Sequence, residues 1–573
     1  MTAHLRARRS PSHPLVPTPP PLVPAPHTLV PDNNPAPGTA RTVVRAEHGS
    51  ERSSHALVPD NNPALIILLL LITALGFGFR LAYVLDVPFF VDEYLQVRAA
   101  ERIVAQGVPL LPSGNFYSHG LLLSYLVAGL VGLGARAGWL LRLPVLLMST
   151  ACIPLTYWLG RRAFSRAAGL VAAAALAMAA DAILWGGRVR MYAPLQFFAL
   201  ALTAVFYLWV VEERDRPLYR WLFVLAFWAA VFCHAEAMLL LPVLGIWALL
   251  QRGSRWCLQP GNLAAFALAG LSIAVEILLR RLGPPVQARV APGVFEPQAR
   301  QYLGAGIDWP GVVKVVEPLF LAPERLAATL LALAGLAWIV LRLARSRRLA
   351  GGSRGRALVH LYALLLPVLL LLLFVVDPEW KSPRYGLMLL PHYFLVAAAV
   401  LAAAGRALAR FLPAARGRLA ASAPWAVPAA VVVLVLITSW PSALEATRET
   451  VPDYEWAFAA VAEQSRPGDQ VITFLCPAAF WHLGRCDYLA APTDFAGFAV
   501  QRDGRWVSGW DLVPLVDSAA GLRQVLDTGR RTWFVVDEGR LAGRYDAEFL
   551  ETVLSRMDLV AQEREMVIFL GPR

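Results

Sequence analysis

The feature that most constrains the fold is a series of long apolar segments separated by short polar connections. A helix needs about 20 residues to cross roughly 30 Å of hydrocarbon, and most of these segments approach that length. Only 16% of the residues are charged and 57% are hydrophobic, whereas soluble proteins carry about 25% charged residues. The chain is therefore predicted to be a polytopic α-helical membrane protein. The apolar segments lie at 65–85, 120–135, 139–160, 167–185, 193–211, 219–234, 236–250, 262–281, 324–343, 357–376, 385–404 and 424–441.

The basic residues gather in the short connections between these segments. The formal net charge of +12 would also suit a protein that binds nucleic acid. Basic residues next to membrane spans instead indicate the cytoplasmic side of the bilayer, so we expect no nucleic-acid partner. The basic connections lie at 161–166, 214–220, 252–255, 342–356 and 406–418.

Placing these connections in the cytoplasm fixes the topology. Only one crossing then fits between the first span and the connection at 161–166, so the short, glycine-rich segment 120–135 is expected to be re-entrant or interfacial. About eleven spans remain, with a cytoplasmic N-terminus and an extracytoplasmic C-terminus. A full span at 120–135 would invert every later segment, against the distribution of arginines.

Composition divides the chain into three parts. Residues 1–62 are rich in Pro and Arg without apolar periodicity, which predicts a disordered tail. Residues 63–441 contain the apolar segments, and residues 442–573 have the composition of a small external α/β domain. Within it, Cys476 and Cys486 can pair if the domain is exported. Its strand-like runs are 471–475, 532–536 and 566–570, and its helical stretches are 456–464, 519–526 and 547–557.

Four polar stretches fall on the predicted external side of the membrane. Charged groups at membrane depth usually face a water-filled cavity or a site rather than lipid. The convergence of these stretches on one face therefore predicts a functional site. They contain Asp92 and Glu93; Arg188, Arg190 and Tyr192; His234 and Glu236; and, within 377–385, Trp380, Lys381, Arg384 and Tyr385.

The adjacent carboxylates Asp92 and Glu93 are the first candidates for chemistry. One can act as a general base while the other orients it or a substrate hydroxyl. The structural alternative is that Asp92 is a helix N-cap, which leaves Glu93 unexplained. A divalent metal at this pair is also an open alternative, because paired carboxylates suit hard cations.

The external cations indicate an anionic ligand. Lys381 and Arg384 oppose the orientation bias, and both residue types bind phosphate. Arg188 or Arg190 can share this role, although arginines at helix ends also snorkel. Arg188 and Tyr192 are four residues apart, so we expect them on one helix face, with Arg190 pointing elsewhere.

Aromatic residues beside these cations suit a sugar. Trp380 and Tyr385 can form an apolar wall against the sugar or the first isoprene unit of a lipid. Tyr192, His234 and Glu236 are assigned to the same sugar or acceptor pocket; for His234 and Glu236 the alternative is a polar turn between two spans. A carboxylate base, phosphate-binding cations and aromatic rings together suit sugar transfer from a lipid phosphate.

Several short motifs between residues 64 and 405 resemble the C-type glycosyltransferase superfamily. The most similar branch comprises bacterial protein O-mannosyltransferases and aminoarabinose-transferase-like enzymes. The order and spacing of the motifs make the set specific, and residues 442–573 carry none of them. The motifs are Asp92-Glu93 after the first span, Tyr117-Ser118-His119-Gly120-Leu121-Leu122, Leu141-Arg142-Leu143-Pro144, Leu159-Gly160-Arg161-Arg162-Ala163-Phe164, Arg190-Met191-Tyr192, and Pro383-Arg384-Tyr385 followed by Leu389-Leu390-Pro391.

The resemblance implies a polyprenyl-phosphate-linked sugar donor, transfer on the extracytoplasmic face of a bacterial inner membrane, and inversion at the anomeric carbon. It also implies that Asp92 is the base, that Glu93 is its neighbour in the motif, and that Arg384 faces the lipid phosphate. His119 and His392 stand where such relatives often have prolines, a departure that bears on the donor and acceptor pockets. His119 is assigned to the sugar or acceptor pocket.

We therefore predict a membrane hexosyl- or pentosyltransferase without an assigned cofactor. The acceptor would be a hydroxyl or amine of a glycan, lipid or protein. The alternative is a transporter or flippase of lipid-linked sugars. No internal repeat is visible among the spans, however, and the charges gather at one face rather than at the midplane, which favours the enzyme.

Overall fold

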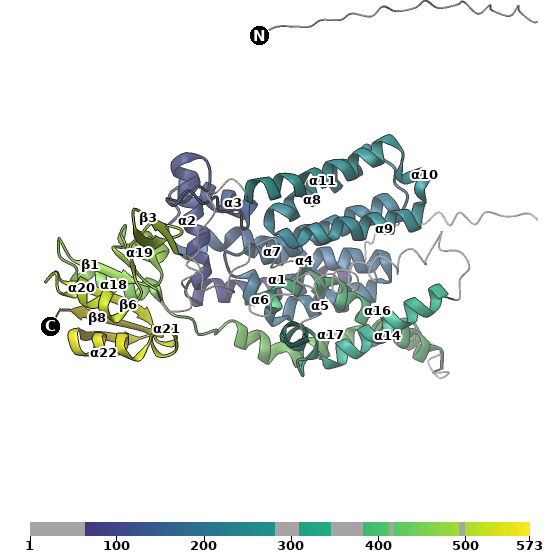
Figure 1. Cartoon of the computed structure of the whole chain (residues 1–573). Coiled ribbons are helices and arrows are strands. Elements are labelled where there is room, and N and C mark those ends of the chain that lie inside the picture. Colours follow the sequence, from purple (N-terminus) through teal and green to yellow (C-terminus); the bar gives the residue numbers. More distant parts are fainter. Residues whose placement is uncertain (1–62, 281–308, 345–381, 412–417, 492–498, 573) are drawn as a thin grey trace, which may run out of the picture. The chain divides into compact units, whose positions relative to one another are not determined.

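The computed structural model describes residues 63–280, 309–344, 382–411, 418–491 and 499–572, which belong to one compact unit, Asn61–Arg573 (Figure 1). The predicted disordered tail, the whole apolar segment 357–376, Trp380 and Lys381 lie outside the described residues. The elements described up to Ala446 are helices, and a mixed sheet with its own helices follows.

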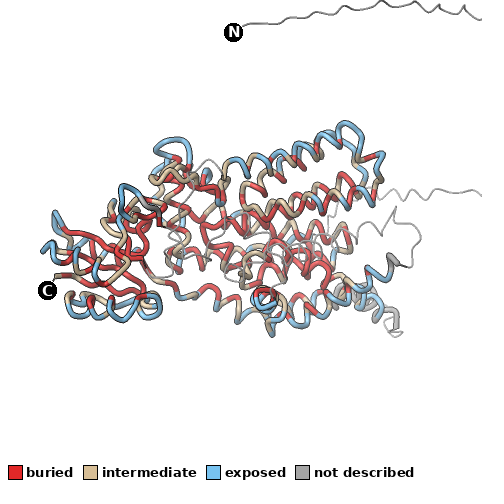
Figure 2. The backbone as a smooth tube through the Cα atoms, in the orientation of Figure 1, coloured by how far each residue is buried: buried red, intermediate tan, exposed pale blue. Residues whose placement is uncertain are grey.

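Seven described helices are long and apolar enough to cross a membrane, or up to nine if each of two bent pairs is one span. This agrees with a polytopic helical membrane protein, while the figure of about eleven spans stays a prediction. Exposed residues recur along the outer helices (Figure 2). Large apolar side chains are exposed on α1, α8, α9, α11, α14 and α17, as expected of a surface that faces lipid. The helices are α1 (Pro63–Asp86), α2 (Val91–Gln106), α3 (Leu121–Gly132), α4 (Gly138–Ala163), α5 (Arg166–Met178), α6 (Ala180–Gly186), α7 (Tyr192–Phe206), η1 (Tyr207–Val211), α8 (Pro217–Cys233), η2 (Ala235–Leu239), α9 (Leu240–Arg252), α10 (Ser254–Cys257), α11 (Pro260–Arg280), α13 (Trp309–Val316), η3 (Glu317–Leu321), α14 (Leu326–Ala344), η4 (Pro383–Leu389), α16 (Leu390–Phe411) and α17 (Arg418–Ala446).

The apolar segment 167–185 differs from the expectation of one straight helix. It is broken into α5 and α6, which meet at 60°. Arg80 of α1 lies fully buried at the break and donates hydrogen bonds to the carbonyls of Leu176 (3.2 Å) and Ala177 (3.1 Å). These carbonyls lie in the last turn of α5, where helical partners run out. The buried guanidinium therefore stabilises a bend that no Pro or Gly announces in the sequence.

Helix α3 covers most of the segment predicted to be re-entrant or interfacial. It has 12 residues, about 18 Å at 1.5 Å per residue, which is shorter than the hydrocarbon core. It begins after Gly120, whose φ of +67° is the left-handed conformation that glycine adopts readily. A Cβ at Gly120 would also lie 3.1 Å from the Cβ of Met191, so the residue lets the loop pass close to the segment before α7.

The C-terminal residues form a six-stranded sheet in the order β5-β2-β1-β6-β8-β7. The first four strands in this order are parallel, and β8 pairs antiparallel with both β6 and β7. The predicted strand-like runs coincide with β1, β6 and β8. The elements are α18 (Tyr454–Gln464), β1 (Gln470–Thr473), α19 (Cys476–Leu483), β2 (Tyr488–Ala490), β3 (Ala499–Arg502), β4 (Arg505–Ser508), β5 (Leu515–Val516), α20 (Ala519–Leu526), β6 (Thr532–Asp537), α21 (Glu538–Arg544), α22 (Ala547–Arg556), β7 (Asp558–Glu563) and β8 (Met566–Gly571).

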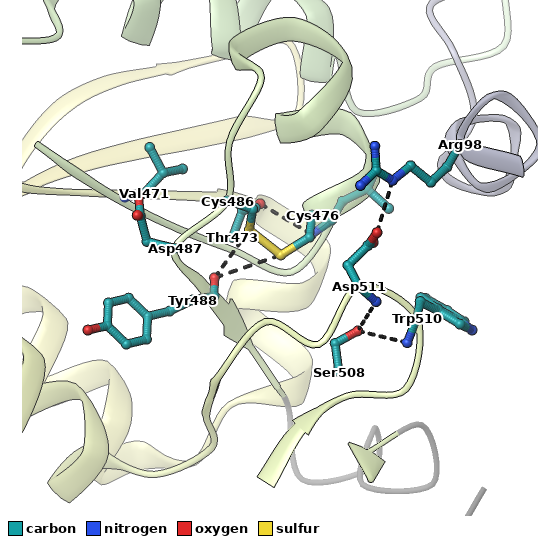
Figure 3. The surroundings of a disulfide bond; sticks show 11 residues. Arg98, Val471, Thr473, Cys476, Cys486, Asp487, Tyr488, Ser508, Trp510 and Asp511 are labelled. Carbon is teal, nitrogen blue, oxygen red and sulfur yellow. Dashed lines mark hydrogen bonds and ion pairs between the residues drawn. A yellow bond between two sulfur atoms is a disulfide. The ribbon is translucent and has the colours of Figure 1, made fainter. Parts of the chain in front are cut away.

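Helix α2 joins the membrane helices to this sheet region. Its Tyr94 and the buried face of α18 belong to one hydrophobic core. Arg98 of α2 forms an ion pair with Asp511 (2.9 Å) and lies 4.3 Å from the ring centre of Phe480 in α19 (Figure 3). A disulfide between Cys476 and Cys486 closes the segment that contains α19. Helix α2, which carries the two adjacent carboxylates in its first turn, is thus in contact with both the membrane helices and the sheet region.

Candidate active site

The two adjacent carboxylates at the start of α2 have different surroundings. Phe90 is the N-cap residue of α2, and its backbone N–H donates to the carboxylate of Glu93 at 2.8 Å. The alternative that Asp92 is the N-cap is therefore wrong. Glu93, at the third helical position, supplies the capping interaction instead, and Asp92 remains free for other contacts.

Glu93 is completely buried and fully hydrogen-bonded. Arg142 of α4 donates a hydrogen bond to each of its oxygens, at 3.0 and 2.7 Å, and the Val189 N–H donates to Oε1 at 2.6 Å. With the bond from Phe90, each oxygen accepts two hydrogen bonds, which uses the usual capacity of a carboxylate. The predicted catalytic role of Glu93 therefore does not fit the structure. Its role is to fix the position of α2.

Arg142 extends this buried unit to the end of α1. Its other three N–H groups donate to the carbonyls of Val84 (3.2 Å), Val87 (2.6 Å) and Pro88 (2.9 Å). All five guanidinium donors are therefore engaged. Arg142 was predicted only as part of a family motif, and its partner Glu93, 49 residues away, could not be identified from spacing.

Asp92 is the carboxylate that meets the predicted phosphate-binding arginines. Its Oδ2 lies 3.4 Å from Nη2 of Arg190 and 3.6 Å from Nη1 of Arg384, and its side chain is 29% exposed. The Arg190 guanidinium also donates to the Asp92 backbone carbonyl at 3.1 Å. The Nε groups of Arg190 and Arg384 are buried without a hydrogen-bond partner among the described residues. Both arginines thus have unused donor capacity beside a partly exposed carboxylate.

Arg188 points away from this group. It donates to the Tyr83 hydroxyl at 2.8 Å and forms an ion pair with Glu449, in the segment after α17. Residues 187–191 connect α6 to α7 without helical structure, so the expected shared helix face of Arg188 and Tyr192 is wrong. A Cβ on Gly187 would lie 2.1 Å from the Tyr83 ring, and this close approach explains a glycine there. With its charge neutralised by Glu449, Arg188 does not fit the expected phosphate-binding role.

Aromatic rings surround Arg384. Its guanidinium carbon lies 5.5 Å from the ring centres of both Tyr192 and Tyr385 and 5.7 Å from that of Trp185. The His234 ring lies 5.6 Å from the Tyr192 ring and 5.8 Å from the Tyr385 ring. Three of the predicted pocket residues therefore lie together beside Arg384, and Trp185 joins them although the sequence did not single it out.

The other predicted pocket residues have separate surroundings. Glu236 is buried next to His234, and the nearest of its oxygens lies 3.4 Å from the ring Nδ1. His119 is exposed and contacts Tyr117 edge-on at 5.7 Å, and the Tyr117 hydroxyl lies 3.4 Å from Arg190. Tyr117 thus links the loop of His119 to the arginine that contacts Asp92.

The carboxylates at the start of α2 do not fit a metal ion. Among the described residues, no group of three or more His, Cys, Asp or Glu side chains is arranged to hold one. The Glu93 oxygens are occupied by Arg142 and two backbone N–H groups, so Glu93 cannot join Asp92 as a ligand. The open alternative of a divalent metal at this pair is therefore not supported by the residues present.

Comparison with known proteins is consistent with this arrangement. Residues 118–278 match the model of the family described as dolichyl-phosphate-mannose-protein mannosyltransferase. The structure of ArnT from Cupriavidus metallidurans bound to undecaprenyl phosphate is similar with a TM-score of 0.60 and 14% identity, over 89% of this chain and 100% of that one. The archaeal oligosaccharyltransferase AglB from Archaeoglobus fulgidus, in complex with an inhibitory peptide and a dolichol-phosphate, has a TM-score of 0.54 at 12% identity, over 83% of this chain and 70% of that one. No curated protein matches the chain significantly.

These findings confirm the resemblance to the C-type glycosyltransferase superfamily. The likeness to the solved structures establishes a shared fold, which covers 89% of this chain in the comparison with ArnT. The alternative of a transporter or flippase is not favoured by any of these similarities.

Proposed function

We propose that this chain is a membrane glycosyltransferase that moves a hexose or pentose from a polyprenyl phosphate to a hydroxyl or amine of a glycan, lipid or protein. The observation that carries the proposal is the Asp92 carboxylate between Arg190 and Arg384, both with unused donors. The family match and the fold shared with a protein bound to undecaprenyl phosphate support the class of donor.

In the proposed reaction, Asp92 accepts the proton of the acceptor as the acceptor oxygen or nitrogen attacks the anomeric carbon. The bond between that carbon and the phosphate oxygen breaks, and the bonding electron pair leaves on the phosphate. A phosphate is a good leaving group, so no general acid is required. Arg384 and Arg190 would stabilise the charge that develops on it, an effect often worth about 3 kcal/mol per donor. Attack from the face opposite the leaving group gives inversion.

The two ion pairs of Asp92 suggest an order of events. Its contacts to the arginines are 3.4 and 3.6 Å, longer than a direct charged hydrogen bond of about 2.8 Å. A lipid phosphate offers the same guanidinium groups closer contacts and more negative charge. Donor binding would therefore draw the arginines away from Asp92 and leave its carboxylate available to the acceptor.

We place this reaction on the extracytoplasmic face of a bacterial inner membrane. The distribution of arginines along the sequence supports a cytoplasmic N-terminus and an external C-terminal α/β domain. The disulfide between Cys476 and Cys486 suits an oxidising compartment.

The proposal is tested with membranes that contain the wild-type protein or the Asp92→Asn variant. The membranes are incubated with a panel of polyprenyl-phosphate sugars and a crude acceptor extract, and mass spectrometry follows the loss of each donor and the release of free polyprenyl phosphate. The matched control is Asp527→Asn, because Asp527 is paired with Arg556 on the exposed surface of the sheet region. We expect one donor to be consumed by the wild type and the control but not by Asp92→Asn. Near-normal turnover by Asp92→Asn would remove Asp92 as the base.

A further inference from the structure

Glu236 is a buried carboxylate without a hydrogen-bond donor. Its side chain is 7% exposed, and neither oxygen has a hydrogen-bond partner among the described residues. Nearly all buried polar groups in proteins are hydrogen-bonded, and an exception calls for an explanation. The alternative of an ordinary polar turn does not explain it, since a turn exposed to water would solvate its carboxylate.

The neighbouring His234 does not satisfy this carboxylate. The backbone N–H of Glu236 donates to Nδ1 of His234 at 3.3 Å, so the Nδ1 lone pair is already engaged. The Glu236 carboxylate lies 3.4 Å from the same nitrogen, which in a neutral ring carries no proton to donate. The proton of that ring is then on Nε2. The pair therefore presents carboxylate acceptors together with one N–H donor.

This pair adjoins the proposed site through the two tyrosines beside Arg384. The His234 ring contacts the rings of Tyr192 and Tyr385, and both tyrosines flank Arg384. A path of contacts thus runs from Asp92 through Arg384 and the two tyrosines to His234 and Glu236.

We infer that Glu236 and His234 form a subsite for a hydroxyl or other hydrogen-bond-donating substituent on the ring of the transferred sugar. The inference rests on the proposed function. A prenyl chain offers no hydrogen-bond donors, and an ionised phosphate offers only acceptors. Asp92 is assigned to the acceptor, so the second carboxylate falls to the donor sugar, whose ring can lie against Tyr192 and Tyr385.

The test separates binding of the sugar from binding of the lipid phosphate. Purified full-length protein is titrated with undecaprenyl phosphate and, separately, with undecaprenyl phosphates that carry mannose, glucose or 4-amino-4-deoxyarabinose. The variant is Glu236→Gln, and the control is Asp469→Asn in the sheet region. Asp469 is also buried, but its Oδ2 accepts hydrogen bonds from Trp533 Nε1 at 2.8 Å and from the Arg466 backbone N–H at 3.0 Å.

We expect the wild type to bind at least one sugar-bearing lipid more tightly than undecaprenyl phosphate. Glu236→Gln should weaken binding of that lipid by about tenfold, the usual effect of one hydrogen bond to a charged group, and leave binding of undecaprenyl phosphate within about twofold. The control should change neither. The variant His234→Asn keeps an acceptor for the Glu236 N–H but removes the Nε2 donor. It should likewise weaken binding of the sugar-bearing lipid and leave binding of undecaprenyl phosphate unchanged. This variant provides the test if Glu236→Gln does not fold.

Two results would overturn the inference. Either both lipids bind folded Glu236→Gln as they bind the wild type, or both are weakened equally. A different result would contradict the proposed function itself. In that case no sugar-bearing lipid binds the wild type more tightly than undecaprenyl phosphate, and none is consumed.

Discussion

The buried ion pair between Glu93 and Arg142 offers a quantitative test of how α2 is held. Arg142→Met would leave Glu93 at 0% exposure without its charged partner, and three backbone carbonyls without a donor. Breaking a buried pair by removing one partner costs about 3–5 kcal/mol, and the lost carbonyl contacts place this variant at the upper end. Glu93→Leu should cost nearly as much, because Arg142 then remains buried and charged.

The double variant distinguishes the ion pair from simple loss of packing. With both charges removed, no uncompensated charge stays buried, so Glu93→Leu with Arg142→Met should be more stable than the sum of the single effects predicts. Directly contacting residues couple by about 0.5–3 kcal/mol, and a buried pair with two hydrogen bonds belongs at the upper end of this range.

The free energy of unfolding is measured for the four proteins by equilibrium unfolding with a denaturing detergent. Donor consumption is measured in parallel, and it should fall in all three variants because the start of α2 positions Asp92. The reasoning would be refuted if each single variant lowered the free energy of unfolding by less than about 1 kcal/mol. It would also be refuted if the loss in the double variant equalled the sum of the two single losses.

Three further predictions concern single residues. Arg384→Lys should raise KM for the donor severalfold in the consumption assay, because lysine loses the planar fork that matches a phosphate, whereas Arg188→Lys should lower the thermal midpoint and leave that KM within about twofold. Burial lowers the pKa of His482 to about 4 from 6.5. The unfolded chain therefore binds more protons between these values, and stability should fall as the pH drops from about 6.5 to 4; His482→Phe should flatten this part of the stability profile. Asp511→Asn should lower the thermal midpoint by several degrees, since Asp511 is buried in its ion pair, whereas Asp527→Asn, in an exposed pair, should change it by less than about one degree.

The sequence predicted the membrane class from apolar length and charge, which are local properties. It also identified Asp92 and Arg384, which the structure brings within 3.6 Å of each other. It could not separate Asp92 from Glu93. Neighbouring residues on a helix point about 100° apart, and which of the two faces the interior depends on the position of α4.

Long-range partners account for the remaining errors. Arg188 was grouped with Arg190 because they are close in sequence, but its partner Glu449 is 261 residues away. The helical face expected for Arg188 and Tyr192 required a continuous helix, whereas α6 ends at Gly186 and α7 begins at Tyr192. The distant partner has no local signal in the sequence, whereas the adjacent glycines Gly186 and Gly187 mark the break and could have predicted it.

The contact between Arg188 and Glu449 also imposes an order on biogenesis. Translation delivers the arginine first, and the carboxylate that neutralises it follows only after α17 has been made. Until then the connection from α6 to α7, which also carries Arg190, lacks one of its anchors. A nascent chain that has inserted all its earlier helices would therefore still have an unfinished active site, and its maturation depends on the last membrane helix and the residues that follow it.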